Sequence, residues 1–586
     1  MNYNLNDISA KQEKASTLRI LRQLLVLIKE ERKNLLLALL AILTNSGLNL
    51  MNPFIIGYTI DTYVVHKNYH GVLLFSGLLV CMALAAFGAS YTQTRMMGGV
   101  GQRMLFKLRN TVFNKLQELP VAFFNQNKAG DLISRINNDT DKINQFFSQS
   151  LMQFIGTLAT MTGAGIFLLV INFRLGVATL VPGLLIFIFT KLTSQWVKKK
   201  NAASLKTTGG LSAEIQESLN NFKVIIAFNR RDYFKKRFAE VNTQNYKTAK
   251  AAGIANNIFI PVYGFFASIA QLIVLTVGIY LISIGQFSIG LLVSYLSYAT
   301  NFYNPLRQLA ALWTNFQVAM AGSDRISHIL NMESNLPVLN ADDSQKSSSL
   351  LEFRNVHFGY PGGKEILHNV NFNLERGKTY AFVGPTGGGK TTTASLIARL
   401  YDPEKGQVFL NGKDIRTYQP AERTRKVGFI LQEPFLFTGT VRDNILYGNE
   451  QYKDTTNEQL EDVIKNANLE SLLAIFENGL ETTVSSGGES ISLGQKQLIA
   501  FMRAVLRNPD LLILDEATAN IDTITEQILQ NILNKLPEET TRVIIAHRLN
   551  TIQNADEIFF VNAGEVIQAG SFDHAVDMLL QGKRAS

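Results

Sequence analysis

The sequence contains one cysteine, Cys81, among 586 residues. A single cysteine excludes an internal disulfide framework and every zinc site that needs several cysteines. Long low-complexity runs are also missing, and 46% of the residues are hydrophobic, which together exclude a disordered chain. No apolar stretch at the extreme N-terminus precedes a small-residue cleavage site, so we expect no cleavable signal peptide.

The length and the mean hydropathy indicate two kinds of domain. At roughly 100–200 residues per domain, a chain of this length contains more than one. A mean hydropathy of +0.08 is too apolar for an ordinary soluble protein and too polar for a chain made only of membrane spans. We therefore expect a membrane half joined to a soluble half.

The first half contains six apolar runs, each about long enough to cross a bilayer. The first three lack Asp, Glu, Lys and Arg altogether. Six spaced runs favour a membrane domain over a large soluble helical core. The predicted spans are 34–60, 71–93, 147–171, 175–193, 258–283 and 289–316, within a membrane domain at 34–330.

Basic residues gather in alternate loops. The long segments 94–146 and 194–257 hold 8 and 12 Lys or Arg residues, whereas the short loops hold one at most. Because Lys and Arg accumulate on the cytoplasmic side, both long loops and both termini are predicted to be cytoplasmic. The net charge of +9 then needs no nucleic acid partner. Within the tail 1–33, residues 18–28 are expected to form an interfacial helix.

Both long loops mix apolar and charged residues at helical spacing, which predicts that the spans continue as helical arms into the cytoplasm. The arms would end in turns at 120–131 and 227–234. Exposed aromatic residues in these turns indicate a partner surface: Phe123, Phe124, Phe228 and Tyr233. A Ser- and Asp-rich linker is predicted at 331–349, followed by a soluble domain at 350–586.

The soluble domain contains a phosphate-binding loop. The apolar run 380–383 reads as a buried strand, and a helix is expected to follow the loop as far as Leu400. Glycines let backbone N–H groups close around phosphates at a helix N-terminus, whose dipole favours anions. The predicted nucleotide-binding residues are Gly384, Pro385, Thr386, Gly387, Gly388, Gly389, Lys390, Thr391 and Thr392.

A second apolar run, 511–514, ends in Asp515 and Glu516. Phosphoryl transfer needs one group that holds Mg²⁺ and another that activates water, and Asp515 and Glu516 suit these two roles. Lys390 is expected to reach the β- and γ-phosphates, while the Thr391 hydroxyl coordinates Mg²⁺. The predicted cofactors are ATP and Mg²⁺.

Ile491-Ser492-Leu493-Gly494-Gln495, which precedes the Asp515 strand, resembles the signature motif of ATP-binding cassette proteins. Six spans fused to one cassette resemble the half-transporters of the ABC exporter family. This resemblance implies an all-α membrane domain with six transmembrane helices, followed by an α/β cassette with a phosphate-binding loop. It also implies roles for Gln432 as the Q-loop glutamine, Asp522 as the D-loop aspartate, His547 as the switch histidine, Tyr360 as the adenine-stacking aromatic and Glu489 as the acidic residue before the signature.

The resemblance also implies a catalytic set and a dimer. Glu516, His547 and Gln432 would be catalytic, and Thr391, Gln432 and Asp515 would hold Mg²⁺. Ser492, Leu493, Gly494 and Gln495 would act in trans, on the nucleotide of a second half-transporter. The pair would export an amphipathic or hydrophobic drug, lipid or peptide by alternating access. An ATP-gated channel or regulator, and an importer of a metal chelate, are the alternatives.

Two questions stay open at the level of sequence. Tyr295, Tyr298, Phe302 and Tyr303 could line a substrate cavity or pack on neighbouring helices. The signature departs from the family's usual Leu-Ser-Gly-Gly-Gln at Ile491 and Leu493, which suits either one chain of a heterodimer or a tolerant homodimer. The expected location is a bacterial inner membrane, with multiple spans.

Overall fold

The computed structural model describes residues 3–5, 29–334, 336–340, 349–485, 491–515, 523–545, 553–570 and 572–581. The described residues fall into two compact units. The membrane unit contains residues up to Gln117 and Gly130–Asn331, apart from the first few residues of the chain. The cassette unit contains Met332–Ser586 together with those first residues and Glu118–Ala129.

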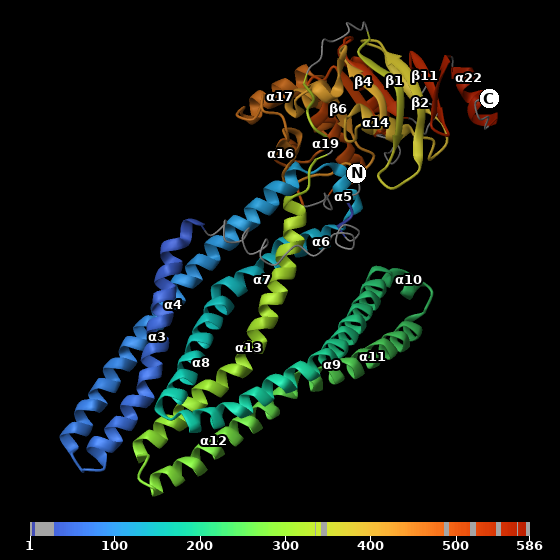
Figure 1. The fold of residues 1–586 in the computed structure, drawn as a ribbon. Coiled ribbons are helices and arrows are strands. Elements are labelled where there is room, and N and C mark those ends of the chain that lie inside the picture. The colour runs from blue at the N-terminus through green and yellow to red at the C-terminus, as the bar shows by residue number, and fades with distance from the viewer. Residues whose placement is uncertain are drawn as a thin grey trace. The chain divides into compact units, whose positions relative to one another are not determined.

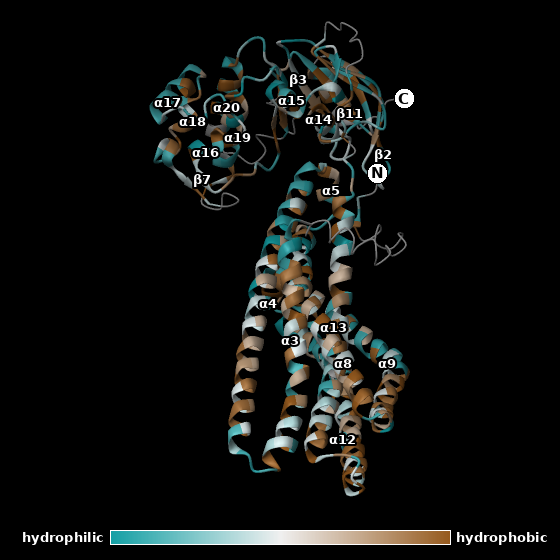
Figure 2. Ribbon diagram, turned by 60° about the vertical axis from the view of Figure 1, so that its left-hand side comes forward, coloured by the Kyte–Doolittle hydropathy of each residue, from teal (hydrophilic) through white to brown (hydrophobic). Residues whose placement is uncertain are grey.

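Helices make up nearly all of the described chain from residue 29 to residue 330, and the longest of them run side by side (Figure 1). Hydrophobic and polar residues are both spread along these helices (Figure 2). The elements are η1 Lys29–Glu31, α3 Arg32–Thr59, η2 Ile60–Val64, α4 Tyr69–Glu118, α5 Val121–Gln126, α6 Ala129–Ser134, η3 Arg135–Asp139, α7 Thr140–Gln145, η4 Phe146–Ser150, α8 Leu151–Ile171, α9 Phe173–Asn220, α10 Phe222–Ala227, α11 Arg231–Asn257, α12 Phe259–Ser283 and α13 Ile289–Leu330.

Within the described residues, five helical segments are long and apolar enough to cross a membrane. They contain α3, α4, α8, α9 and α12. The sixth predicted span lies in α13, which is not among the five because polar residues such as Asn301, Asn304 and Gln308 interrupt its apolar sequence. The helical arms beyond the predicted spans are confirmed, since α4 continues to Glu118 and α9 to Asn220.

The aromatic residues of α13 pack between helices. Tyr295 and Tyr298 are fully buried, and their hydroxyls donate hydrogen bonds to the carbonyl oxygens of Leu168 at 2.6 Å and Leu50 at 2.7 Å. Tyr303 bonds the carbonyl oxygen of Thr179 in the same way. A tyrosine buried in an apolar setting needs such a partner for its hydroxyl. These three tyrosines therefore hold the bundle together.

Helices α3 and α13 approach each other closely. The Ser294 hydroxyl donates to the carbonyl oxygen of Pro53 at 2.7 Å. A Cβ atom on Gly57 would lie 2.5 Å from the Gly290 carbonyl oxygen, a distance that backbone atoms cannot tolerate. At the ends of the two helices the Asp61 carboxylate accepts the Gly290 N–H at 2.8 Å and also accepts the Ser288 hydroxyl.

The cassette unit joins sheets and short helices. Its elements after residue 350 are β1 Leu351–Gly359, β2 Glu365–Leu374, β3 Thr379–Val383, α14 Lys390–Ile397, β4 Lys405–Leu410, β5 Lys413–Asp414, η5 Ile415–Thr417, α15 Pro420–Lys426, β6 Val427–Ile430, β7 Gly439–Thr440, α16 Val441–Ile445, α17 Asn457–Asn466, α18 Glu470–Leu473, η6 Gly479–Glu481, β8 Thr483–Val484, α19 Leu493–Val505, β9 Leu511–Asp515, α20 Thr523–Lys535, β10 Thr541–Ile545, β11 Glu557–Asn562, β12 Glu565–Gly570 and α22 Phe572–Gln581.

Six of the described strands form the central sheet, in the order β12-β11-β3-β10-β9-β6. Strands β11, β3, β10, β9 and β6 run parallel, and β12 pairs antiparallel with β11. Every residue of β3 and β9 is buried, as their continuous apolar sequences predict for parallel strands covered on both faces. A second sheet, β2-β1-β4-β5, is antiparallel. The predicted fold class, a helical membrane domain followed by an α/β cassette, is confirmed.

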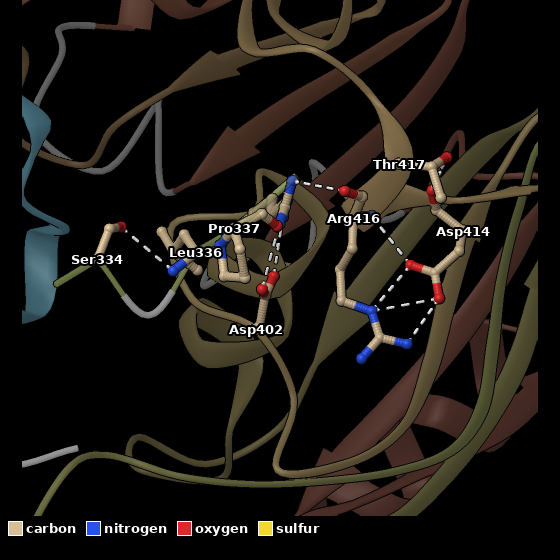
Figure 3. Close-up of polar contacts among 8 residues, drawn as sticks. Ser334, Leu336, Pro337, Asp402, Asp414, Arg416 and Thr417 are labelled. Atoms are coloured by element: carbon tan, nitrogen blue, oxygen red, sulfur yellow. Dashed lines mark hydrogen bonds and ion pairs between the residues drawn. The ribbon is translucent and has the colours of Figure 1, made fainter. Parts of the chain in front are cut away.

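The described residues of the segment after α13 make polar contacts with the cassette (Figure 3). The Leu339 N–H donates to the Arg416 carbonyl oxygen at 2.9 Å. The guanidinium of Arg399, a buried residue, donates to the Pro337 carbonyl oxygen at 2.7 Å and pairs with Asp402. The polar sequence that predicts a linker thus includes residues that the cassette fixes in place.

We predict that the close crossing of α3 and α13 makes Gly57 intolerant of a side chain. Gly57→Ala should lower the free energy of unfolding by about 1–3 kcal/mol, because the added methyl group forces the helices apart. Gly47→Ala in the same helix is the matched control, since a Cβ atom there meets nothing within 4 Å. Thermal unfolding of the solubilised protein measures both. Equal midpoints for the two variants would contradict the close crossing.

Candidate functional site

The loop Gly384–Gly389 connects β3 to α14 at the centre of the six-stranded sheet. Pro385, Thr386 and Gly387 are exposed, whereas Gly388 and Gly389 are buried beneath them. The loop therefore offers an accessible turn directly before a helix N-terminus. Backbone N–H groups at such a position attract anions, phosphates above all.

The backbone geometry of this loop requires glycine at two positions. Gly384 has φ of 146°, and a Cβ atom there would lie 2.0 Å from the Val561 carbonyl oxygen. Gly389, the residue before α14, has φ of 115°, and its Cβ atom would lie 2.7 Å from Leu367. Both φ values lie in the region that side chains disfavour. The glycines thus shape the cradle that the sequence predicts.

Lys390 closes the loop from inside. Its Nζ donates hydrogen bonds to the carbonyl oxygens of Gly384 at 2.8 Å and Pro385 at 3.0 Å. The residue is only 5% exposed, which holds the ammonium group against the loop. A cation fixed there suits the β- and γ-phosphates of a nucleotide.

Thr391 and Asp515 are brought together from separate elements. The Thr391 hydroxyl, in the first turn of α14, lies 3.4 Å from Asp515 Oδ1, at the end of β9. Hydroxyl and carboxylate oxygens are ligands that Mg²⁺ prefers. Among the described residues no group of three or more His, Cys, Asp or Glu side chains gathers.

Tyr360 follows β1 and lies beside α14. Its hydroxyl is 3.3 Å from the Thr392 hydroxyl, and its ring meets the ring of Tyr401 edge to face at 5.2 Å between centroids. The Tyr401 hydroxyl accepts a hydrogen bond of 2.7 Å from Asn125, in α5. Burial raises the pKa of Tyr401, so the hydroxyl stays protonated at neutral pH. The candidate adenine-stacking residue is thus linked to α5 through one tyrosine.

Strand register brings the ends of β3, β10, β9 and β6 to one edge of the sheet. Ile545 pairs with Phe382 on one side and with Asp515 on the other, while Ile430 pairs with Leu514. Gln432, two residues after β6, is exposed beyond the same edge of the sheet. Strands β6 and β9 are neighbours and parallel, so they end at the same edge of the sheet. Gln432, after β6, and Asp515, at the end of β9, therefore lie at that same edge. Glu489, Glu516, Asp522 and His547 lie outside the described residues, so their roles stay predictions.

The signature begins helix α19. The Ser492 hydroxyl accepts the Gln495 N–H at 3.2 Å, and the Gln495 side chain accepts the Ser492 N–H at 2.9 Å. This capping box leaves other N–H groups of the first turn available to an anion. Leu493, the residue that departs from the family pattern, is 37% exposed at this helix start.

Two features of the site were missed by sequence reasoning. Helix α14 ends at Ile397, not at Leu400, because Arg399 adopts a positive φ of 51° and bonds Asp402. Tyr401 was not singled out, although an aromatic residue shortly after the phosphate-loop helix was visible. Its partners come from residues 276 and 41 positions away, and one sequence carries no signal of such pairs.

Comparison with known proteins identifies the family. The family model for the ABC transporter transmembrane region matches residues 35–306, and the model for the ABC transporter cassette matches residues 367–519. An uncharacterized ABC transporter ATP-binding protein of Bacillus subtilis is 35% identical over 93% of this chain and 90% of its own length. The chain is an ABC transporter.

Two further relatives have more informative names. A fatty acid ABC transporter ATP-binding/permease protein of Mycobacterium bovis is 30% identical over 84% of this chain and 78% of its own length. A probable multidrug resistance ABC transporter ATP-binding/permease protein of Bacillus subtilis is 29% identical over 87% of this chain and 75% of its own. This ABC transporter is a multi-pass membrane protein that binds ATP and couples its hydrolysis to transport.

We predict that Lys390→Ala weakens ATP binding about 10- to 100-fold, because it removes charged hydrogen bonds to the phosphates. Lys364→Ala, at an exposed position before β2, is the control and should bind ATP as the wild type does. Equilibrium binding of a fluorescent ATP analogue measures both. Unchanged affinity in Lys390→Ala would remove this lysine from the site.

Proposed function

We propose that this ABC transporter is one half of a dimeric exporter that moves an amphipathic or hydrophobic molecule across the membrane by alternating access. The transported molecule is a drug, a lipid or a peptide. The names of the relatives support this class, since one is a fatty acid transporter and another a probable multidrug transporter. A bacterial inner membrane with both termini in the cytoplasm fits the distribution of basic residues along the loops.

One observation carries the dimer proposal. The cassette has one phosphate loop, after β3, and one capped helix start at the signature, on a different element, α19. In the half-transporters that this chain resembles, a nucleotide is held between the loop of one chain and the signature of another. We propose a head-to-tail pair in which Ser492, Leu493, Gly494 and Gln495 face the nucleotide bound by the second chain. ATP binding would then close the pair, and hydrolysis would reopen it.

The roles within each site follow the chemistry of phosphoryl transfer. Lys390 and the loop N–H groups would hold the phosphates, while Thr391, Asp515 and Gln432 would provide oxygen ligands to Mg²⁺, which would neutralise phosphate charge when bound. Glu516 polarises the attacking water, and His547 contacts the γ-phosphate. Tyr360 stacks on adenine. Asp522 lies in the D-loop, between the two sites of the pair.

The turns at the ends of the arms transmit the movement. Phe123, in α5, is fully buried, and Asn125 of the same helix bonds Tyr401. Phe228 and Tyr233, around the second turn, are exposed by 74% and 57% within the chain. We propose that this second turn docks on the cassette of the other chain. A hollow of about 220 Å³ on the cassette, lined among others by Phe435, Phe437, Tyr447 and Arg503, offers an aromatic surface of matching chemistry.

Transport in oriented vesicles tests the proposal. Inside-out vesicles are given ATP on the outside, with a fluorescent fatty acid in one assay and the dye ethidium in another. An exporter should accumulate at least one of the two probes in the vesicle lumen. Accumulation only in right-side-out vesicles with ATP inside would indicate an importer. Equilibration with no accumulation would indicate an ATP-gated channel.

We predict that Glu516→Gln binds ATP as tightly as the wild type but hydrolyses it at least about 100-fold more slowly, because the amide cannot activate water. Glu538→Gln, at an exposed position before β10, is the matched control. ATP affinity and turnover are measured separately for each variant. Turnover near wild type in Glu516→Gln would remove Glu516 from catalysis.

We also predict that Leu493 decides whether the isolated chain is active. A Cβ atom at this position restricts the approach of backbone to a phosphate. If the chain works in a heterodimer, the purified chain is nearly silent, and Leu493→Gly or a second subunit activates it. Robust ATPase activity that Leu493→Gly leaves unchanged would show a homodimer that tolerates leucine.

A further inference from the structure

Residues Tyr3–Leu5 pack into the cassette unit, far along the chain from the residues they contact. Tyr3 and Leu5 are each only 2% exposed. Their partners belong to the turn around α5 and to the segment after α13, which lie in the same compact unit. Neither the nucleotide chemistry nor the phosphate loop accounts for this burial.

The backbone of residues 3–5 is held by two side chains at the end of α5. The Tyr3 N–H donates to Gln126 Oε1 at 2.8 Å, and the Leu5 N–H donates to Asn127 Oδ1 at 3.1 Å. In return, Asn127 Nδ2 donates to the Tyr3 carbonyl oxygen at 2.9 Å and to the Phe123 carbonyl oxygen at 2.8 Å. The Asn127 side chain thus connects α5 to the N-terminal residues through both its amide oxygen and its amide nitrogen.

The Tyr3 side chain joins two segments. Its ring meets the buried Phe123 ring edge to face, with 6.5 Å between centroids. Its hydroxyl donates to the Glu333 carbonyl oxygen at 3.2 Å, three residues after the end of α13. The Tyr3 side chain therefore contacts both the turn that ends the first arm and the segment that follows α13.

Helix α5 is also held by the cassette itself, through Asn125 and Tyr401. We propose that Tyr3–Leu5 form a clasp that fixes α5 to the segment after α13, and that Tyr3 is a positioning residue for the coupling of ATP binding to the membrane helices. The proposal rests on the ATP-driven transport proposed above. All contacts of the clasp lie within one unit, and the proposal requires that they stay closed through the transport cycle.

The chain contains a label-free reporter for this coupling. Both of its tryptophans, Trp196 in α9 and Trp313 in α13, belong to the membrane unit. Tryptophan fluorescence of the full chain in lipid nanodiscs therefore reports how the membrane helices respond when ATP binds to the cassette. ATP affinity and basal ATPase activity are measured on the same samples.

Tyr3→Ala should keep the ATP affinity and the basal ATPase activity, while the ATP-driven shift in the conformational equilibrium falls about fivefold. Tyr3→Phe, which loses only the bond to Glu333, should show a smaller loss. Tyr69→Ala is the matched control, because Tyr69 is 71% exposed in α4. A full fluorescence response in Tyr3→Ala would overturn the clasp. The comparison is made on a wild-type preparation that hydrolyses ATP, with a second subunit added if the isolated chain is silent. If that active preparation gave no response to ATP, the proposed function would be overturned, and the clasp with it.

A reversible crosslink separates coupling from simple packing. In a Cys81→Ser background, Asn127→Cys removes the three hydrogen bonds of the Asn127 amide and, combined with Leu5→Cys, should reduce the response. A short, reducible methanethiosulfonate crosslinker should restore the response, and a reductant should abolish it again in the same sample. Failure to crosslink would show that the clasp does not form. A crosslinked protein that binds ATP but still gives no response would overturn a clasp that stays closed.

Discussion

The parallel pairing of β3, β10 and β9 determines where the nucleotide chemistry can occur. Ile545 lies between Phe382 and Asp515, so the three strands end within one residue of each other. The phosphate loop leaves the first of these ends, and Asp515 closes the third. Because strand ends of a parallel sheet share an edge, a shift of one strand by two residues would separate Thr391 from Asp515. The site therefore depends on strand register before it depends on any side chain.

Much of this site was predictable because its signals are local. Consecutive residues form the phosphate loop, and the buried strands before the loop and before Glu516 are short apolar runs. The helical arms and the fold class follow from periodicity in the same way. The role of Glu516 was inferred from its position after a buried strand, and the roles of Asp522 and His547 from family resemblance. All three lie outside the described residues, so their roles stay predictions.

Apart from the early end of α14, the features that sequence did not predict join segments far apart in the chain. A polar run such as 331–349 signals the absence of regular structure, but the carbonyl groups that Arg399 and Leu339 engage depend on backbone position. Likewise, composition could not decide whether the tyrosines of α13 line a cavity. The partner of each hydroxyl decides it, since the carbonyl groups that accept from Tyr295 and Tyr298 belong to α8 and α3.

The meeting of Gly57 with Gly290 also limits how the membrane helices can move. Two helices whose backbones touch, with Ser294 bonded across the contact, cannot slide or rotate past each other without a clash. Asp61 adds a second fixed point at the start of α13, so rotation about the first contact is blocked as well. Helices α3 and α13 are therefore joined at this end, and a path that opened between them here would first have to break the hydrogen bonds of Ser294 and Asp61.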